Sequence, residues 1–146
     1  MTSRHLVLGT LLLLSLSGQA CGDCPPGTVC ERGGFAEYTV RNLSSVELWV
    51  GAESAGATFE TPLPMAVPPG MARVLATDGL IGVDPTPTDS FTWVTLSVAD
   101  AQGVLQEVYR QEPMDAVLWT GGRVDGEDGY GVSEYVLEVG DRDLAL

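Results

Sequence analysis

Three cysteines near the N-terminus are the side chains of this sequence best suited to covalent chemistry. Cys24 and Cys30 enclose the five residues PPGTV, a loop short enough to close through its Pro-Pro-Gly turn. A zinc site needs more thiolates or a histidine than this segment supplies. We therefore expect a small disulfide between Cys24 and Cys30, with free or intermolecular thiols as the alternative. Cys21 is then the odd thiol, and its fate depends on the residues that precede it.

The first twenty residues have the pattern of a secretory signal. Arg4 and His5 precede an apolar run of 12 residues, LVLGTLLLLSLS, at positions 6–17. A transmembrane helix needs about 20 apolar residues, so this run is too short to span a bilayer. A buried helix would continue in an amphipathic pattern, whereas a segment rich in Gly, Pro and Cys follows here. We expect residues 1–20 to be cleaved as a signal peptide.

The segment LSGQAC at positions 16–21 resembles the lipobox of bacterial lipoproteins, with Gly18 and Gln19 where that family prefers leucine and a small residue. The resemblance implies that Cys21 carries a thioether-linked diacylglycerol and becomes the new N-terminus. Acylation of Cys21 would leave Cys24 and Cys30 as an even pair, which suits an oxidising compartment. Small residues at 18 and 20 also fit an ordinary signal-peptidase site, which would release a soluble secreted protein.

The resemblance also implies a location. The sequence is similar to uncharacterised envelope lipoproteins of Gram-negative, myxobacterial type, so we expect a lipid-anchored protein of the bacterial envelope. The outer membrane is favoured over the inner one, with the body in the periplasm or at the cell surface. Two or more acyl chains would anchor it stably. Residues 21–34 would then be the lipidated cysteine and a tether, whose Gly- and Pro-rich chain reaches about 20 Å.

Most nucleophilic catalysis is excluded by the residues that remain after cleavage. His5 is the single histidine, and all seven basic side chains of the full chain are arginines. Ser-His and Cys-His nucleophiles, lysine Schiff bases and His-ligated zinc are therefore absent. No G-x-S-x-G elbow, phosphate-binding loop or dinucleotide fingerprint occurs. We expect no enzyme and no cofactor.

Carboxylates are the abundant ionisable groups, with 20 Asp and Glu in the chain. A pair held in a cleft can hydrolyse glycosides, but nothing in the sequence marks one pair as special. Carboxylate oxygens are also the preferred ligands of calcium ions. Asp125, Glu127 and Asp128 form the best local cluster, to which Asp141 and Asp143 near the C-terminus would add. The cluster lacks EF-hand spacing, and a solvated hairpin turn is the simpler interpretation.

The composition sets the class of partner. A formal net charge of −13 makes a nucleic-acid partner unfavourable, because nucleic acids are held mainly by clustered Arg and Lys. A hydrophobic fraction of 45% is too high for a disordered acidic chain. We expect one folded acidic domain over residues 35–146.

Alternating apolar residues predict that this domain is all-β. We expect a hairpin from residues 38–41 and 46–50, a clearer hairpin from 91–98 and 104–110, and strands over 65–67, 71–77, 115–120 and 131–139. A short apolar piece at 80–83 precedes two prolines. About seven or eight short strands in this length predict an antiparallel β-sandwich of immunoglobulin-like size, with a closed barrel as the alternative. No helical apolar period occurs outside the signal.

The three tryptophans lie inside strand patterns, so packing is their first interpretation. Trp49 and Trp93 fall opposite their aliphatic neighbours, on a face that would be exposed and would offer a binding platform.

Two functions follow from the sequence: a non-catalytic module that binds an envelope protein, glycan or peptide, or a structural or accessory subunit of an envelope assembly. The first predicts converging polar groups and the second an exposed apolar patch or free strand edge.

Overall fold

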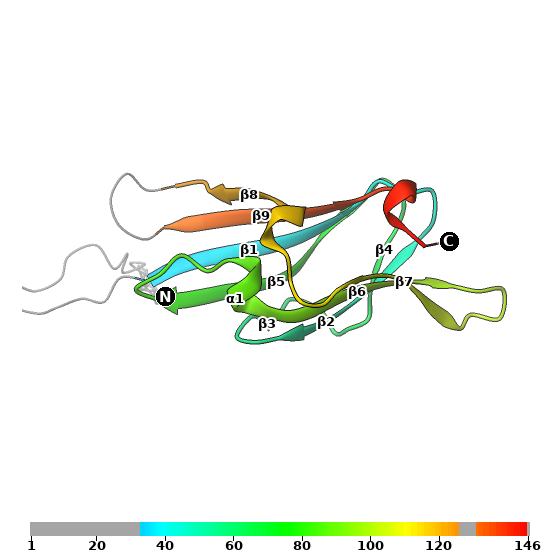
Figure 1. Ribbon diagram of the computed structural model, residues 1–146, viewed down its shortest axis with the longest axis horizontal. Coiled ribbons are helices and arrows are strands. Elements are labelled where there is room, and N and C mark those ends of the chain that lie inside the picture. Colours follow the sequence, from blue (N-terminus) through cyan, green and yellow to red (C-terminus); the bar gives the residue numbers. More distant parts are fainter. Residues whose placement is uncertain (1–32, 126–130, 146) are drawn as a thin grey trace, which may run out of the picture. The chain divides into compact units, whose positions relative to one another are not determined.

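The computed structural model describes residues 33–125 and 131–145, which form nine strands in two sheets (Figure 1). One sheet has the order β3-β5-β1-β9-β8, comprising β1 (Gly33–Asn42), β3 (Thr58–Phe59), β5 (Ala72–Ile81), β8 (Trp119–Arg123) and β9 (Val132–Val139). The other has the order β4-β2-β6-β7, comprising β2 (Leu48–Ser54), β4 (Met65–Val67), β6 (Phe91–Ala99) and β7 (Leu105–Gln111). The predicted all-β sandwich is confirmed, and neither sheet closes into a barrel.

Helical structure among the described residues is limited to single turns. These are α1 (Pro87–Ser90) and the 3₁₀ turns η1 (Ala116–Leu118) and η2 (Asp141–Asp143). Within residues 33–125 and 131–145, no helix has the length and hydropathy needed to cross a membrane.

The core lies between the two sheets and is filled by every second side chain of the strands. Tyr38 of β1 and Leu48 of β2 have no exposed surface. The Tyr38 ring lies 4.9 Å from the ring of Phe91 and 5.9 Å from that of Trp119, both edge to face. Such pairs contribute about 0.5–1.5 kcal/mol beyond the area they bury. Trp119 is therefore a core residue, as its strand pattern predicted.

The predicted hairpin between residues 38–41 and 46–50 is wrong. β1 pairs with β5 and β9, whereas β2 pairs with β4 and β6, so the turn between β1 and β2 crosses from one sheet to the other. Asn42 holds this crossing: its Nδ2 donates to the carbonyl oxygens of Val46 at 2.7 Å and Val67 at 2.8 Å. The alternation correctly predicted the buried face, but alternation carries no information about the partner strand.

The predicted hairpin over residues 91–98 and 104–110 is confirmed as β6 and β7, which pair antiparallel. Asp100 begins its turn, since one carboxylate oxygen accepts the backbone N–H groups of Gln102 and Val104, each at 2.9 Å. Gly103 takes the left-handed conformation that the turn requires, with φ +81°. The backbone hydrogen bond from Val104 is the main reason why the pKa of Asp100 lies below its usual value.

Two further strand predictions need correction. Residues 116–118 are not extended, because Asp115 accepts a hydrogen bond from the Val117 backbone N–H at 3.0 Å and so caps the turn η1. The strand begins only at Trp119. The apolar piece expected at residues 80–83 is not separate either, because β5 continues through Ile81 alongside β1.

Candidate functional site

The outer face of the four-stranded sheet carries two partly buried tryptophans. Trp49 of β2 lies opposite Ser97 of β6, and Trp93 of β6 lies opposite Glu53 of β2. Paired residues of antiparallel strands share a face, so both indoles are on the side away from the core, as the sequence predicted. Trp49 and Glu53 are four residues apart, which separates the two tryptophans by about 13 Å along the strands.

Gly51 leaves the surface between the two indoles without a side chain on β2. Gly51 lies between Trp49 and Glu53 on β2 and opposite Thr95 on β6. A Cβ at Gly51 would lie 2.8 Å from Thr95 Oγ1 and 3.7 Å from Trp93 Cζ3. The Trp93 ring therefore leans toward the bare backbone of Gly51, and a larger residue there would displace it.

Trp93 is fixed from two sides. Its Nε1–H donates to Glu53 Oε2 at 2.7 Å, and the Arg110 guanidinium carbon lies 5.5 Å from its ring centroid. Arg110 also forms ion pairs with Glu107 at 3.1 Å and with Glu112. The hydrogen bond with Glu112 raises the pKa of Arg110 above its already high value, so the guanidinium stays charged. A ring held in this way loses little freedom when a ligand binds.

The positions that surround the two indoles are small or polar, and the exposed apolar side chain of Leu105, opposite Ala99, lies further along the same face. The outward positions beside the tryptophans are Gly51, Glu53, Thr95, Ser97, Glu107 and Arg110. We call the set of Trp49, Trp93 and these six residues the tryptophan face. It combines two aromatic rings with hydroxyl, carboxylate and guanidinium groups, which can hydrogen-bond a polar ligand.

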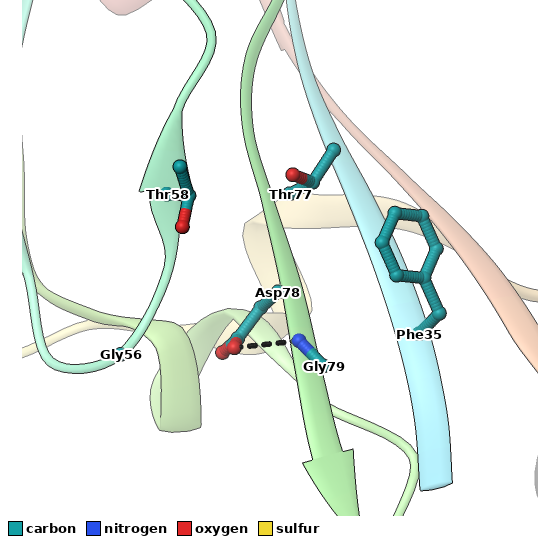
Figure 2. A pocket seen from close by; sticks show the side chains of 6 residues that line it. All are labelled: Phe35, Gly56, Thr58, Thr77, Asp78 and Gly79. Carbon is teal, nitrogen blue, oxygen red and sulfur yellow. Dashed lines mark hydrogen bonds between the residues drawn. The ribbon is translucent and has the colours of Figure 1, made fainter.

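A shallow hollow of about 270 Å³ lies on the other sheet, between β3, β5 and β1 (Figure 2). Its lining residues are Phe35, Gly56, Thr58, Thr77, Asp78 and Gly79. Figure 2 shows the Asp78 carboxylate on the side of Gly56, bonded to the backbone N–H of Gly79 at 2.7 Å. The hollow is smaller than ordinary small-molecule sites, which enclose about 300–1,000 Å³.

The charged group of this hollow belongs to the framework of the fold. Asp78 Oδ2 accepts from Ser90 Oγ at 2.6 Å, and Ser90 Oγ is 2.6 Å from the Tyr38 hydroxyl. All three residues are buried. The chain of hydrogen bonds links β1 and β5 of one sheet to Ser90, the last residue of α1, which directly precedes β6 of the other sheet. No buried side-chain nitrogen or oxygen of the described residues lacks a partner, so every buried polar atom of this network is hydrogen-bonded within the fold.

The ionisation of Tyr38 in this network should make the stability of the fold depend on pH in the alkaline range. Burial raises the pKa of Tyr38, with Ser90 opposing the shift through its hydrogen bond, whereas an unfolded tyrosine titrates near pH 10. Above about pH 10, and below the raised pKa of the folded state, Tyr38 is deprotonated in the unfolded chain and still protonated in the folded one. The unfolded state then binds fewer protons, so the free energy of unfolding falls as the pH rises. We expect the free energy of unfolding, measured with urea, to decrease there by up to about 1.4 kcal/mol per pH unit for this group. Tyr38→Phe should flatten that decrease, and an equally steep decrease in the variant would contradict the assignment.

Asp125 does not share one site with Asp141 and Asp143, the residues expected to add to the calcium cluster. Asp125 accepts the backbone N–H of Val132 at the start of β9, whereas Asp141 follows the end of β9 and accepts from Ser45 N at 2.7 Å. Asp143 accepts from Gly140 N at 2.8 Å. Asp125 is thus separated from Asp141 by the length of β9. Among residues 33–125 and 131–145, no group of three metal-ligating side chains occurs.

The remaining predicted site residues lie outside the described residues. They are Cys21, Cys24 and Cys30 of the expected anchor and disulfide, and Glu127 and Asp128 of the calcium cluster. Their roles stay predictions.

Neither models of known protein families nor curated proteins match this chain. The candidate site therefore rests on geometry alone. Sequence reasoning predicted Trp49 and Trp93 but missed Glu53 and Arg110, which become neighbours of Trp93 only through strand register. It also missed Asp78, for which no sequence signal exists beyond an acidic residue within an apolar strand.

Proposed function

We propose that this protein is a lipid-anchored, non-catalytic binding module of the bacterial envelope, and that its tryptophan face binds a glycan. The observation that carries the proposal is the pair of indoles on one outer sheet face with the side-chain-free Gly51 between them. The negative face of an aromatic ring attracts the positively polarised C–H groups of a sugar ring. Ser97, Glu53 and Arg110 offer hydrogen-bond partners for its hydroxyl groups.

A protein partner is less well supported on this face. Stable protein interfaces have a fully buried, mainly apolar centre, whereas here the two indoles are separated by Gly51 and by polar side chains. The anchoring part of the proposal rests on the lipobox-like segment that ends at Cys21. The chemistry available, with no histidine or lysine in the described residues, supports binding rather than catalysis.

Removing either indole should weaken glycan binding strongly. We expect Trp49→Ala and Trp93→Ala each to weaken the affinity for a soluble oligosaccharide at least about fivefold, because stacking of a planar base on an aromatic side chain contributes about 1–3 kcal/mol. Titrations of intrinsic fluorescence with a panel of soluble peptidoglycan fragments and oligosaccharides would provide the affinities. Phe35→Ala is the matched control, since it removes an exposed aromatic ring from the other sheet.

A second variant tests the shape of the site without removing a ring. Gly51→Val would place a side chain against Thr95 and Trp93, and we expect it to weaken binding while the fold is retained. Circular dichroism would check the fold. Unchanged affinity in Trp49→Ala, Trp93→Ala and Gly51→Val together would contradict the proposed site.

The alternative is an accessory subunit of an envelope assembly. The observation that favours it is the outer edge of β8, since among the described residues this strand pairs with β9 alone; the outer edge of β7 is partly covered by Ala145, whose backbone N–H donates to the Val108 carbonyl at 2.9 Å. An open strand edge can accept a strand from another chain. Failure of every glycan to bind, with recovery of one stoichiometric protein partner from solubilised envelope, would favour this function.

A further inference from the structure

One end of the five-stranded sheet gathers exposed or partly exposed apolar side chains from β1, β5 and β9 and from the residue that follows β8. Phe35 of β1 lies opposite Val132 of β9 and Gly79 of β5. Val124 follows β8 and donates its backbone N–H to Val132 at 2.8 Å. Ile81, at the end of β5, lies opposite Gly33.

These side chains share the outer face of the sheet. Ser133 is 1% exposed and points inward, so the adjacent Val132 points outward, together with its partner Phe35. The exposed fractions are 44% for Phe35, 69% for Ile81 and 55% for Val124. We call Phe35, Ile81, Val124 and Val132 the apolar end.

The apolar end is also the place where the chain enters the domain. β1 begins at Gly33, which pairs with Ile81. Cys21 precedes Gly33 by 12 residues, and a chain of that length spans at most about 40 Å. A lipid on Cys21 would therefore keep this end of the sheet close to a bilayer surface.

From this position we infer that the apolar end contacts the lipid surface and orients the domain on it, an inference that rests on the proposed anchoring at Cys21. The charged side chains described at this end are bonded within the fold. Asp125, which follows Val124, accepts the backbone N–H of Val132 with its carboxylate, and its carbonyl oxygen accepts from Arg123 Nε at 2.7 Å. Asp84 Oδ1 accepts from Gly131 N at 3.0 Å, and its Oδ2 lies 3.9 Å from Arg123 Nη1. The next outward row along the strands, Glu37 beside Glu134, lies about 7 Å further from the end, where it can remain in water.

Hydroxyl-radical footprinting on phosphatidylcholine vesicles tests the contact. The full mature chain, carrying Cys24→Ser and Cys30→Ser, is coupled at the Cys21 thiol to a maleimide lipid, so that it is anchored whether or not cells acylate it. We expect oxidation of Phe35 and Ile81 to fall several-fold relative to the uncoupled chain. Leu43 and Met71 are the internal controls, because they are 56% and 54% exposed near the other end of β1 and should not change.

A pair of variants gives a second readout. A single acyl chain binds membranes only marginally, so any added contact should raise the vesicle-bound fraction of a singly lipidated chain. We expect Ile81→Glu to lower that fraction several-fold and Leu43→Glu to leave it unchanged. Equal oxidation of Phe35 and Ile81 with and without anchoring, or equal effects of the two variants, would overturn the inference. Failure of the anchoring proposal is separate: mass spectrometry of the cell-derived protein would then find Cys21 without lipid.

Discussion

Replacing Tyr38 with alanine is expected to lower the free energy of unfolding by about 3–5 kcal/mol, the range for truncating a large buried aromatic residue. Tyr38 has no exposed surface and contacts the rings of Phe91 and Trp119 edge to face. Its ring is also stacked on that of Tyr135, with centroids 5.6 Å apart. The substitution would leave a cavity at the point where the aromatic side chains of both sheets meet. Urea denaturation followed by circular dichroism would measure the loss.

A conservative variant separates the ring from the hydroxyl group. Tyr38→Phe keeps the aromatic packing and removes only the hydrogen bond to Ser90, whose Oγ still donates to Asp78. We expect a loss of about 1 kcal/mol, the usual net value of one hydrogen bond. A Tyr38→Phe variant as unstable as Tyr38→Ala would show that the hydroxyl network, rather than ring packing, dominates at this position.

The second large effect is expected at Asn42. Its side chain makes four hydrogen bonds: two from Nδ2 to the carbonyls of Val46 and Val67, and two to Oδ1 from Ser44 N at 2.9 Å and Ser44 Oγ at 2.6 Å. Asn42→Ala would remove the side-chain partner of the Val67 carbonyl and of the Ser44 N–H, while the Val46 carbonyl keeps its bond from Ser44 Oγ at 3.1 Å. We expect the free energy of unfolding to fall by about 2–4 kcal/mol. The expected loss is large because the turn that crosses from β1 to β2 is not held by strand pairing, so it depends on the hydrogen bonds of Asn42.

The neighbouring residue provides the control. Leu43 is 56% exposed, so Leu43→Ala should change stability by less than about 0.5 kcal/mol. Asn42→Asp keeps the acceptor but removes both donors to Val46 and Val67, and it should be at least as destabilising as alanine. Denaturation midpoints for Asn42→Ala and Leu43→Ala that coincide would contradict the role of Asn42 as the tie between the sheets.

Local patterns predicted the buried faces of the strands well. The alternation that contains Tyr38 and Leu48 correctly separated inward from outward residues, and the turn chemistry at Asp100 and Gly103 correctly located the β6–β7 hairpin. Both signals are local, since they need only the period of a strand and the backbone demands of a turn. The same signals placed Trp49 and Trp93 on the outer face.

Partner strands could not be predicted in the same way. β1 lies beside β9, in parallel, although Phe35 and its partner Val132 are far apart in the sequence. Nothing in either segment specifies this pairing, because both strands would be equally well buried beside other neighbours. The hairpin wrongly expected between β1 and β2 arose from the usual preference of consecutive strands to pair. Here Asn42 supplies a hydrogen-bonded crossing between the sheets instead.

Of the candidate site, only Trp49 and Trp93 could be predicted from the sequence, because the remaining contacts also depend on which strands pair. Glu53 reaches Trp93 because their strands pair in one register. Arg110 of β7, a third strand, lies over Trp93. The register of β7 against β6 shifts between Leu96 and Ser97 of β6. A bulge of this kind changes which side chains are neighbours. Predicting these contacts requires the pairing of three strands, which no local pattern provides.

The indole N–H signals of the three tryptophans provide the most direct test of the proposed glycan-binding face. In a ¹H–¹⁵N correlation spectrum recorded during titration with a bound oligosaccharide, the Trp49 and Trp93 signals should shift. Trp119 is 4% exposed and donates its Nε1–H to Gln111 at 3.1 Å inside the core, so its signal should stay in place. Saturating ligand that leaves Trp49 and Trp93 unmoved while other residues of the domain shift would contradict the proposed site.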